Sequence, residues 1–295
     1  MLESLRQMFR LTDAEAAAAA DDGKITLADV LARDWFDLWY QPKIELRTMR
    51  LDGAEALVRA RHPQRGVLPP GVFLPGAAEA DMLALTERVI LTALKDWEDF
   101  AANGLSLKIA INVPVSALVR LPIGAMVREH RPVAESWPGL ILEVTEDEII
   151  RDLKLANDAA EQLCAARCSL ALDDFGAGYS WIARLKQLPF SELKIDRAYV
   201  ANCHIDRVNA GLCEVFVELA KRFGLKTVAE GVELVHESHK LQALGCDVGQ
   251  GYLYAKPMPK AQLIAAMRRR LSGAAPPVPM PKSRLTGLIP GLGSG

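Results

Sequence analysis

Five short apolar segments of this chain each end at a carboxylate or an amide side chain, and this recurrence constrains its fold most strongly. The polar residues that follow the runs are Asn112, Glu143, Asp173, Asp196 and Glu230. Short β-branched runs between longer helical stretches are typical of parallel strands in an α/β fold. In an α/β barrel the carboxyl ends of all strands meet on one face. We therefore expect residues scattered from 112 to 230 to converge into one acidic cluster.

Crowded carboxylates repel one another unless a cation neutralises them. Oxygen donors suit hard divalent ions such as magnesium or manganese. The sharpest local motif is Asp173-Asp174, followed by Phe175-Gly176. Two adjacent carboxylates at a strand end can bind two ions, one of them bridging. The alternative interpretation is a pair of solvated aspartates that cap the next helix.

The order of the predicted elements favours a closed barrel. Residues 35–46 and 51–61 read as two strands joined by a tight turn, which implies an antiparallel pair. Further strands are predicted near 106–112, 139–144, 168–173, 192–196, 225–229 and 247–250, with helices at 81–102, 152–167, 206–223 and 235–244. About eight strands alternate with helices in this way, which fits a barrel with one reversed strand. A doubly wound open sheet is the structural alternative.

The chain divides into three parts by composition. Residues 1–24 are Ala-rich without a clear apolar face and are predicted to be a leader helix or linker. Residues 25–272 carry the alternating strands and helices of the barrel. Residues 273–295 are rich in Gly and Pro, and we expect them to be disordered.

Composition excludes some classes of function. The formal net charge of −2 argues against binding a nucleic-acid polymer or a membrane surface through net charge. No apolar stretch is long enough to predict a membrane segment. The five cysteines form an odd set without a CxxC pair, and no signal peptide precedes them, so a cytoplasmic setting is expected.

Several short motifs in a fixed order resemble the EAL family of bacterial cyclic di-GMP phosphodiesterases. The likeness runs from about residue 26 to 270. The motifs are Tyr40-Gln41-Pro42, Glu55-Ala56-Leu57, Arg61-His62-Pro63, Glu143-Val144-Thr145-Glu146, Asp173-Asp174-Phe175-Gly176, Leu193-Lys194-Ile195-Asp196, Ala229-Glu230-Gly231-Val232-Glu233, and Gln250-Gly251-Tyr252 followed by Lys256-Pro257. Each motif is weak by itself, and their shared order and spacing carry the resemblance.

The resemblance implies a TIM-like (β/α)8 barrel with an antiparallel first strand, spanning residues 25–272. It also implies a metal-dependent phosphodiesterase that hydrolyses cyclic di-GMP to linear pGpG by two-metal-assisted attack of water. Two Mg²⁺ or Mn²⁺ ions are the implied cofactors, with Ca²⁺ expected to inhibit. A homodimer and an upstream sensory or regulatory domain or partner are further implications of the family.

Residue roles carry over from the family motif by motif. The implied metal ligands are Glu55, Asn112, Glu143, Asp173, Asp174 and Glu230. The implied catalytic residues are Lys194, which positions or helps activate water, Glu230, and Glu146, which steadies the loop after Asp174. The implied substrate contacts are Gln41, Leu57, Arg59, Asp196, Glu233, Gln250 and Pro257.

Several residues allow an alternative to the role that the resemblance implies, or depart from the family pattern. The positions that depart from the family pattern are Ala60, Ala78, Ala177 and Trp181, and none of them is an implied metal ligand. Lys194 and Asp196 could instead form a rim salt bridge, and Trp39 is assigned to packing. A non-catalytic cyclic di-GMP receptor that signals to a partner protein is the alternative function. The complete ligand set favours the enzyme. A metal-dependent barrel enzyme of another type would fit the acidic cluster alone, but it does not explain the ordered motifs.

Overall fold

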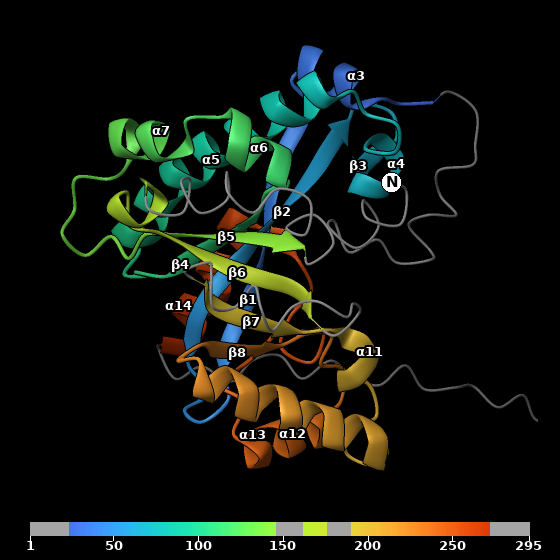
Figure 1. The fold of residues 1–295 in the computed structure, drawn as a ribbon. Helices are drawn as coiled ribbons and strands as arrows, with labels where there is room; N and C mark the ends of the chain where they lie inside the picture. Colours follow the sequence, from blue (N-terminus) through green and yellow to red (C-terminus); the bar gives the residue numbers. More distant parts are fainter. Residues whose placement is uncertain (1–23, 146–161, 176–189, 272–295) are drawn as a thin grey trace, which may run out of the picture.

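The computed structural model describes residues 24–145, 162–175 and 190–271, and within them eight strands close into a barrel (Figure 1). These strands are β1 (Phe36–Glu45), β2 (Leu51–His62), β4 (Lys108–Asn112), β5 (Leu140–Thr145), β6 (Cys168–Phe175), β7 (Phe190–Ile195), β8 (Lys226–Ala229) and β9 (Val248–Gly249). β1 pairs antiparallel with both β2 and β9, which closes the ring. The other neighbouring strands are parallel. The predicted barrel with an antiparallel first strand is therefore confirmed.

Two short strands extend this sheet beyond the barrel. β3 (Gly66–Leu68) pairs with the end of β2, and β10 (Met258–Pro259) pairs with β1 at Trp39 and Tyr40. The sequence pattern predicted neither of them. Both are too short for an alternating hydrophobic pattern to reveal them.

Helices cover the outside of the barrel, with α5 to α7 on one side and α12 and α13 on another (Figure 1). The helices are α3 (Leu27–Ala32), α4 (Pro70–Phe73), α5 (Glu79–Ala102), α6 (Val115–Arg120), α7 (Ile123–His130), α11 (Arg197–Val200), α12 (Arg207–Arg222), α13 (Val235–Leu244) and α14 (Lys260–Leu271). Thr26 caps α3, since its hydroxyl accepts a hydrogen bond of 3.2 Å from the Asp29 amide. Most of the helix predicted at 152–167 lies outside the described residues.

Alternation along the strands separates an apolar shell from the barrel interior. On β5, Leu140 and Leu142 belong to the main apolar core, whereas Ile141 packs in a separate small cluster with Ala110 and Ala171. Because successive side chains point to opposite faces, residues two positions further on from this cluster also point inward. Ala110, Ile141 and Ala171 thus line one level of the interior, and Asn112, Glu143 and Asp173 line the level nearer the carboxyl-terminal mouth.

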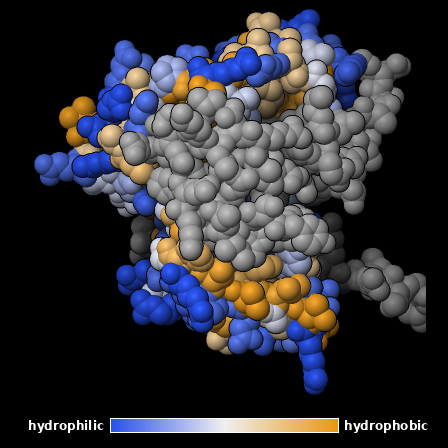
Figure 2. Space-filling view, in the orientation of Figure 1, coloured by the Kyte–Doolittle hydropathy of each residue, from blue (hydrophilic) through white to orange (hydrophobic). Residues whose placement is uncertain are grey.

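Exposed apolar side chains gather around α12 and α13, and Figure 2 shows an apolar area on this part of the face. They include Ile205, Val208 and Val215 along α12 and its preceding turn, and Val235 at the start of α13. Contiguous exposed apolar surface often marks an interaction site. No helix in the described ranges has both the length and the apolar character needed to cross a bilayer.

Candidate active site

Polar side chains from six strands and from the segments that follow β8 and β9 meet inside the barrel near its carboxyl-terminal mouth. The buried members are Gln41, Lys43, Glu55, Glu143, Asp173, Glu192, Lys194, Glu230 and Gln250, and Asn112 is partly buried beside them. Four of the five apolar runs of the sequence thus deliver an acidic or amide side chain to one place. The exception is Asp196, which lies outside this cluster.

Lys194 lies at the centre of the carboxylates. Its ammonium nitrogen is 2.5 Å from Glu143 Oε2, 2.9 Å from Glu230 Oε1 and 3.0 Å from Asp173 Oδ1. Its side chain is completely buried. The alternative of a rim salt bridge with Asp196 is therefore wrong. The cation that crowded carboxylates require is supplied, in this arrangement, by the chain itself.

A second buried ammonium group, that of Lys43, lies deeper in the barrel. Its nitrogen donates to Glu143 Oε1 at 2.7 Å and contacts Glu192 Oε2 at 3.3 Å. Burial lowers the pKa of Lys43, but the charges of Glu143 and Glu192 outweigh burial and hold that pKa above its usual value. Sequence reasoning missed Lys43. The signal was its position two residues after Gln41, which places both side chains on the same face of β1.

Amide groups hold Glu55 on the other side of the interior. Asn112 Nδ2 donates to Glu55 Oε1 at 2.8 Å, and Gln250 Nε2 donates to Glu55 Oε2 at 2.6 Å. Gln250 Nε2 also lies 3.1 Å from Gln41 Oε1, and Gln41 in turn donates to the Ala255 carbonyl. The buried Oε1 atom of Gln250 makes no hydrogen bond to a described residue. A buried acceptor in this condition is unusual and suits a site that takes a ligand.

The donor set fits divalent cations. Five buried carboxylates face only two buried ammonium groups here, so negative charge is in excess. All the candidate ligands offer oxygen, which hard divalent ions prefer. Within the described ranges, no group of three acidic, His or Cys side chains is arranged as a metal cage. Lys194 instead lies between three of these carboxylates.

At the rim, Arg59 lies next to an aromatic ring. Its guanidinium carbon is 5.7 Å from the centroid of the Trp39 ring, and its Nη1 donates to the Val58 carbonyl at 2.8 Å. Trp39 pairs in register with Leu57, so the two side chains share a face. Trp39 is only partly buried, and its indole nitrogen donates to Asp37 at 2.9 Å. Trp39 therefore does more than pack in the core, because its ring lies against the guanidinium group of Arg59 at the rim.

Besides Leu57 and Arg59, three further implied substrate contacts lie outside the buried polar cluster. β7 ends at Ile195, so Asp196 no longer follows strand alternation, and it accepts from the Ala198 amide at 2.7 Å as the cap of α11. Glu233 is exposed and pairs with Arg197 at 3.4 Å. Pro257 is partly buried and directly precedes β10.

Other candidates fall outside what the structure describes. These are Glu146, Ala177, Trp181 and the side chain of Asp174, although the Asp174 backbone belongs to β6. Ala60 is fully buried in the main apolar core. It therefore lies on the face of β2 away from Arg59, in the apolar shell around the barrel and not at the polar site. Ala78 is the N-cap of α5 and makes no side-chain cap there.

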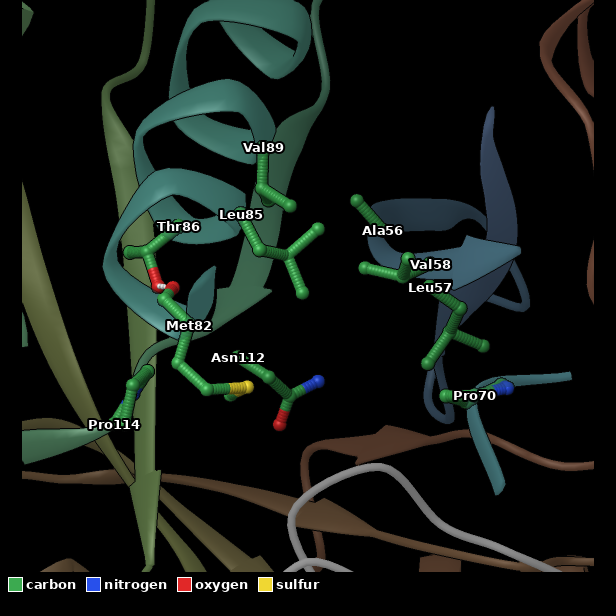
Figure 3. Close-up of a pocket in the computed structure, with 10 residues that line it drawn as sticks. All are labelled: Ala56, Leu57, Val58, Pro70, Met82, Leu85, Thr86, Val89, Asn112 and Pro114. Atoms are coloured by element: carbon green, nitrogen blue, oxygen red, sulfur yellow. Dashed lines mark hydrogen bonds between the residues drawn. The ribbon is translucent and has the colours of Figure 1, made fainter. Parts of the chain in front are cut away.

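A small apolar cavity adjoins Asn112 between β2 and α5 (Figure 3). Leu57 and Pro70 lie on one side of it, and Met82 and Leu85 lie on the other. Its volume of about 10 Å³ is barely that of one water molecule. This cavity cannot hold a nucleotide.

Comparison with known proteins gives a consistent answer. The EAL domain family matches residues 25–257 of the chain. The bifunctional diguanylate cyclase/cyclic di-GMP phosphodiesterase MucR of Pseudomonas aeruginosa is 36% identical over 244 residues, which are 82% of this chain and 36% of that protein. The cyclic di-GMP phosphodiesterase PA2567 of the same organism is 36% identical over 239 residues, 79% of this chain and 40% of that protein.

A solved structure agrees with these relatives. The PaMucR phosphodiesterase in complex with c-di-GMP matches with a TM-score of 0.73 at 36% identity, covering 80% of this chain and 97% of that chain. The chain spans less than half the length of the two curated relatives named above.

Proposed function

The chain belongs to the EAL domain family, and we propose that it is a metal-dependent phosphodiesterase that hydrolyses cyclic di-GMP to linear pGpG. The observation that carries this proposal is the buried set of carboxylate and amide oxygens around Lys194. The names of its relatives supply the substrate and the reaction. The structure of a relative with c-di-GMP bound supports the same ligand class.

We propose that the site binds two divalent ions, either Mg²⁺ or Mn²⁺, through the oxygen donors of the mouth. The proposed ligands are Glu55, Asn112, Glu143, Asp173, Asp174 and Glu230. When bound, such ions polarise a phosphate oxygen and lower the pKa of water, which promotes in-line displacement. Calcium is expected to bind the same oxygens but to support little turnover, because its coordination geometry is looser.

The reaction adds water across one phosphodiester bond. The water oxygen bonds to phosphorus, the bond from phosphorus to the 3′ oxygen breaks, and the leaving oxygen takes a proton to become a hydroxyl group. Lys194 and Glu230, which are 2.9 Å apart, are the proposed residues that position the water and carry its proton. Glu146 is proposed to steady the loop that follows Asp174.

Substrate recognition is proposed for the inner wall and the rim. Arg59 suits a phosphate, since a guanidinium group binds phosphate through charge-assisted hydrogen bonds. Gln41, Leu57 and Gln250 lie below it on the same side of the barrel, around Glu55. The rim positions Asp196, Glu233 and Pro257 complete the proposed set.

Setting and assembly are also proposals. We propose a cytoplasmic protein that acts as a homodimer and responds to a sensory or regulatory domain or partner. The alternative function is a cyclic di-GMP receptor without catalysis, which would bind the nucleotide and signal to a partner protein.

One experiment separates the two functions. The purified chain is incubated with cyclic di-GMP and Mg²⁺, and pGpG is quantified by chromatography. We expect pGpG to form and expect excess chelator to stop its formation. An Asp173→Asn variant serves as the catalytic control. Binding of cyclic di-GMP without any pGpG under Mg²⁺ or Mn²⁺ would support the receptor instead.

A further inference from the structure

The two lysines of the barrel interior hold the two oxygens of one carboxylate. Lys43 contacts Glu143 Oε1 at 2.7 Å, and Lys194 contacts Glu143 Oε2 at 2.5 Å. The side chains of Lys43 and Glu143 are 1% and 0% exposed, so water does not compete for these contacts. The carboxylate of Glu143 is thus fixed in one orientation, with Oε2 facing Lys194 and the mouth.

Glu192 anchors Lys43 from the other side. Its Oε2 lies 3.3 Å from Lys43 Nζ, and its side chain is 6% exposed. Glu192 and Lys194 are two positions apart on β7, so both point into the barrel. A continuous buried chain of charges therefore runs from Glu192 through Lys43 to Glu143.

We propose that Lys43, held by Glu192, is a positioning residue that orients the Glu143 carboxylate for a divalent cation at the barrel mouth. This inference rests on the proposed function, because Glu143 is a metal ligand only under that proposal. Lys43 lies on the interior side of Glu143, away from the mouth cluster of Asp173 and Glu230. It therefore acts through Glu143 and not by contact with substrate or water.

An electrostatic role and a positioning role for Lys43 predict opposite effects of its removal on metal affinity, so experiment can separate them. A nearby ammonium group repels a cation, so a purely electrostatic role predicts tighter metal binding in Lys43→Met. A positioning role predicts weaker binding, because Glu143 is no longer fixed. Partners that orient metal ligands are typically worth about 10–100-fold in metal affinity. A purely structural role predicts a lower melting temperature with unchanged metal affinity.

The experiment titrates Mn²⁺ into the full chain without substrate and follows free Mn²⁺ by electron paramagnetic resonance. The variants are Lys43→Met and the double variant Lys43→Met/Glu192→Gln, which removes one positive and one negative charge together. Leaving Glu192 buried without its partner is costly, so the double variant preserves a folded protein if the single variant does not fold. Melting temperatures of the metal-free proteins verify the fold.

The matched control is Lys226→Met. Lys226 pairs with Asp52 at the opposite end of the barrel, where both side chains are partly exposed. We expect this control to bind Mn²⁺ as the wild type does. We expect both Lys43 variants to bind Mn²⁺ about 10–100-fold more weakly. With cyclic di-GMP at saturating Mn²⁺, KM should stay unchanged and kcat should recover towards wild type.

The outcomes separate this inference from the proposed function. Equal or tighter Mn²⁺ binding by both Lys43 variants overturns the positioning role while leaving the phosphodiesterase proposal intact. A wild-type protein that binds no Mn²⁺ overturns the metal-dependent function, and the role of Lys43 falls with it. Weaker binding by the Lys226→Met control as well would show a general loss of stability and would also overturn the inference.

Discussion

Lys194 Nζ lies 2.5 Å from Glu143 Oε2, and both side chains are fully buried inside the barrel. The same ammonium group also contacts Asp173 and Glu230. Charge counting from the sequence treats these carboxylates as mutually repelling. The structure shows that each of them also stabilises a buried ammonium group. Removing a carboxylate therefore relieves repulsion and deprives Lys194 of a partner at the same time.

Asp173→Ala should abolish turnover and modestly lower the stability of the metal-free protein. Lys194 keeps Glu143 and Glu230 in this variant, so the loss is smaller than for a single buried pair. We expect the melting temperature in chelator to fall by about 2–4 °C, which corresponds to about 1 kcal/mol. Differential scanning fluorimetry measures the shift, and pGpG formation measures the activity.

The matched control for this variant is Glu218→Ala, whose exposed pair with Arg222 contributes little stability. A rise in the melting temperature of metal-free Asp173→Ala would show that repulsion dominates at the mouth. A collapse of the fold would instead place Asp173 in the structural core.

Activity should depend on the identity of the metal ion. We expect Mg²⁺ and Mn²⁺ to support hydrolysis and Ca²⁺ to bind with little turnover. Pre-incubation with chelator followed by addition of each ion, with pGpG quantified, measures this order. Competition by Ca²⁺ against limiting Mg²⁺ shows that both ions use the same site. Full activity in excess chelator would falsify the metal mechanism.

Arg59→Met should weaken cyclic di-GMP binding. A hydrogen bond to a charged group contributes about 1.5–3 kcal/mol, so the dissociation constant should rise by about 10–100-fold. Arg61→Met is the matched control, since Arg61 lies two residues further along β2 and pairs with Asp37 at 2.7 Å. Equilibrium binding measured with Ca²⁺ present avoids turnover. Equal losses in both variants would mean that Arg59 makes no specific phosphate contact.

How much could be predicted from the sequence depended on how regular each strand is. Glu55, Leu57 and Arg59 lie within the long strand β2, so simple alternation placed them on one face. The same rule predicts that Asp196, two residues after Lys194, shares its face. That placement was wrong, because β7 ends one residue earlier and Asp196 caps a helix.

The contacts of the buried lysines could not be predicted, because they depend on barrel closure. Lys43 and Glu143 are 100 positions apart in the chain, and only the pairing of β1 with both of its neighbours brings them together. A lysine on a strand is usually taken for an exposed residue. Local sequence therefore reveals which residues end strands but not which buried charges they meet.

The homodimer is a prediction from the family, and the apolar area on α12 offers a direct test of one interface. Sedimentation velocity at micromolar concentration should show a dimer. Val208→Glu and Val215→Glu introduce charge at exposed positions of that helix, so they shift the protein to monomer only if α12 lies in the interface. Wild-type protein that is fully active as a monomer would contradict a required dimer.

Lys194→Met should reduce kcat sharply while cyclic di-GMP binding persists. Loss of a group that positions or deprotonates water typically costs about 10²–10⁴-fold in rate. Both the wild type and the variant are assayed for kcat in Mg²⁺ and for nucleotide binding in Ca²⁺. The position of Lys194 among three carboxylates adds a second expectation. Because its ammonium group repels a cation at the same place, Lys194→Met should bind Mn²⁺ at least as tightly as the wild type.

This pair of results distinguishes catalysis from structural support. If Lys194 only holds the carboxylates together, its removal should weaken Mn²⁺ binding, and saturating Mn²⁺ should then restore kcat. If Lys194 acts on water, kcat stays low at every Mn²⁺ concentration although the metal is bound. Lys226→Met, at the far end of the barrel, should change neither quantity. A Lys194→Met rate within about tenfold of wild type, below the range for positioned proton-transfer groups, would remove Lys194 from the mechanism. Water activation would then be left to the metal ions and Glu230.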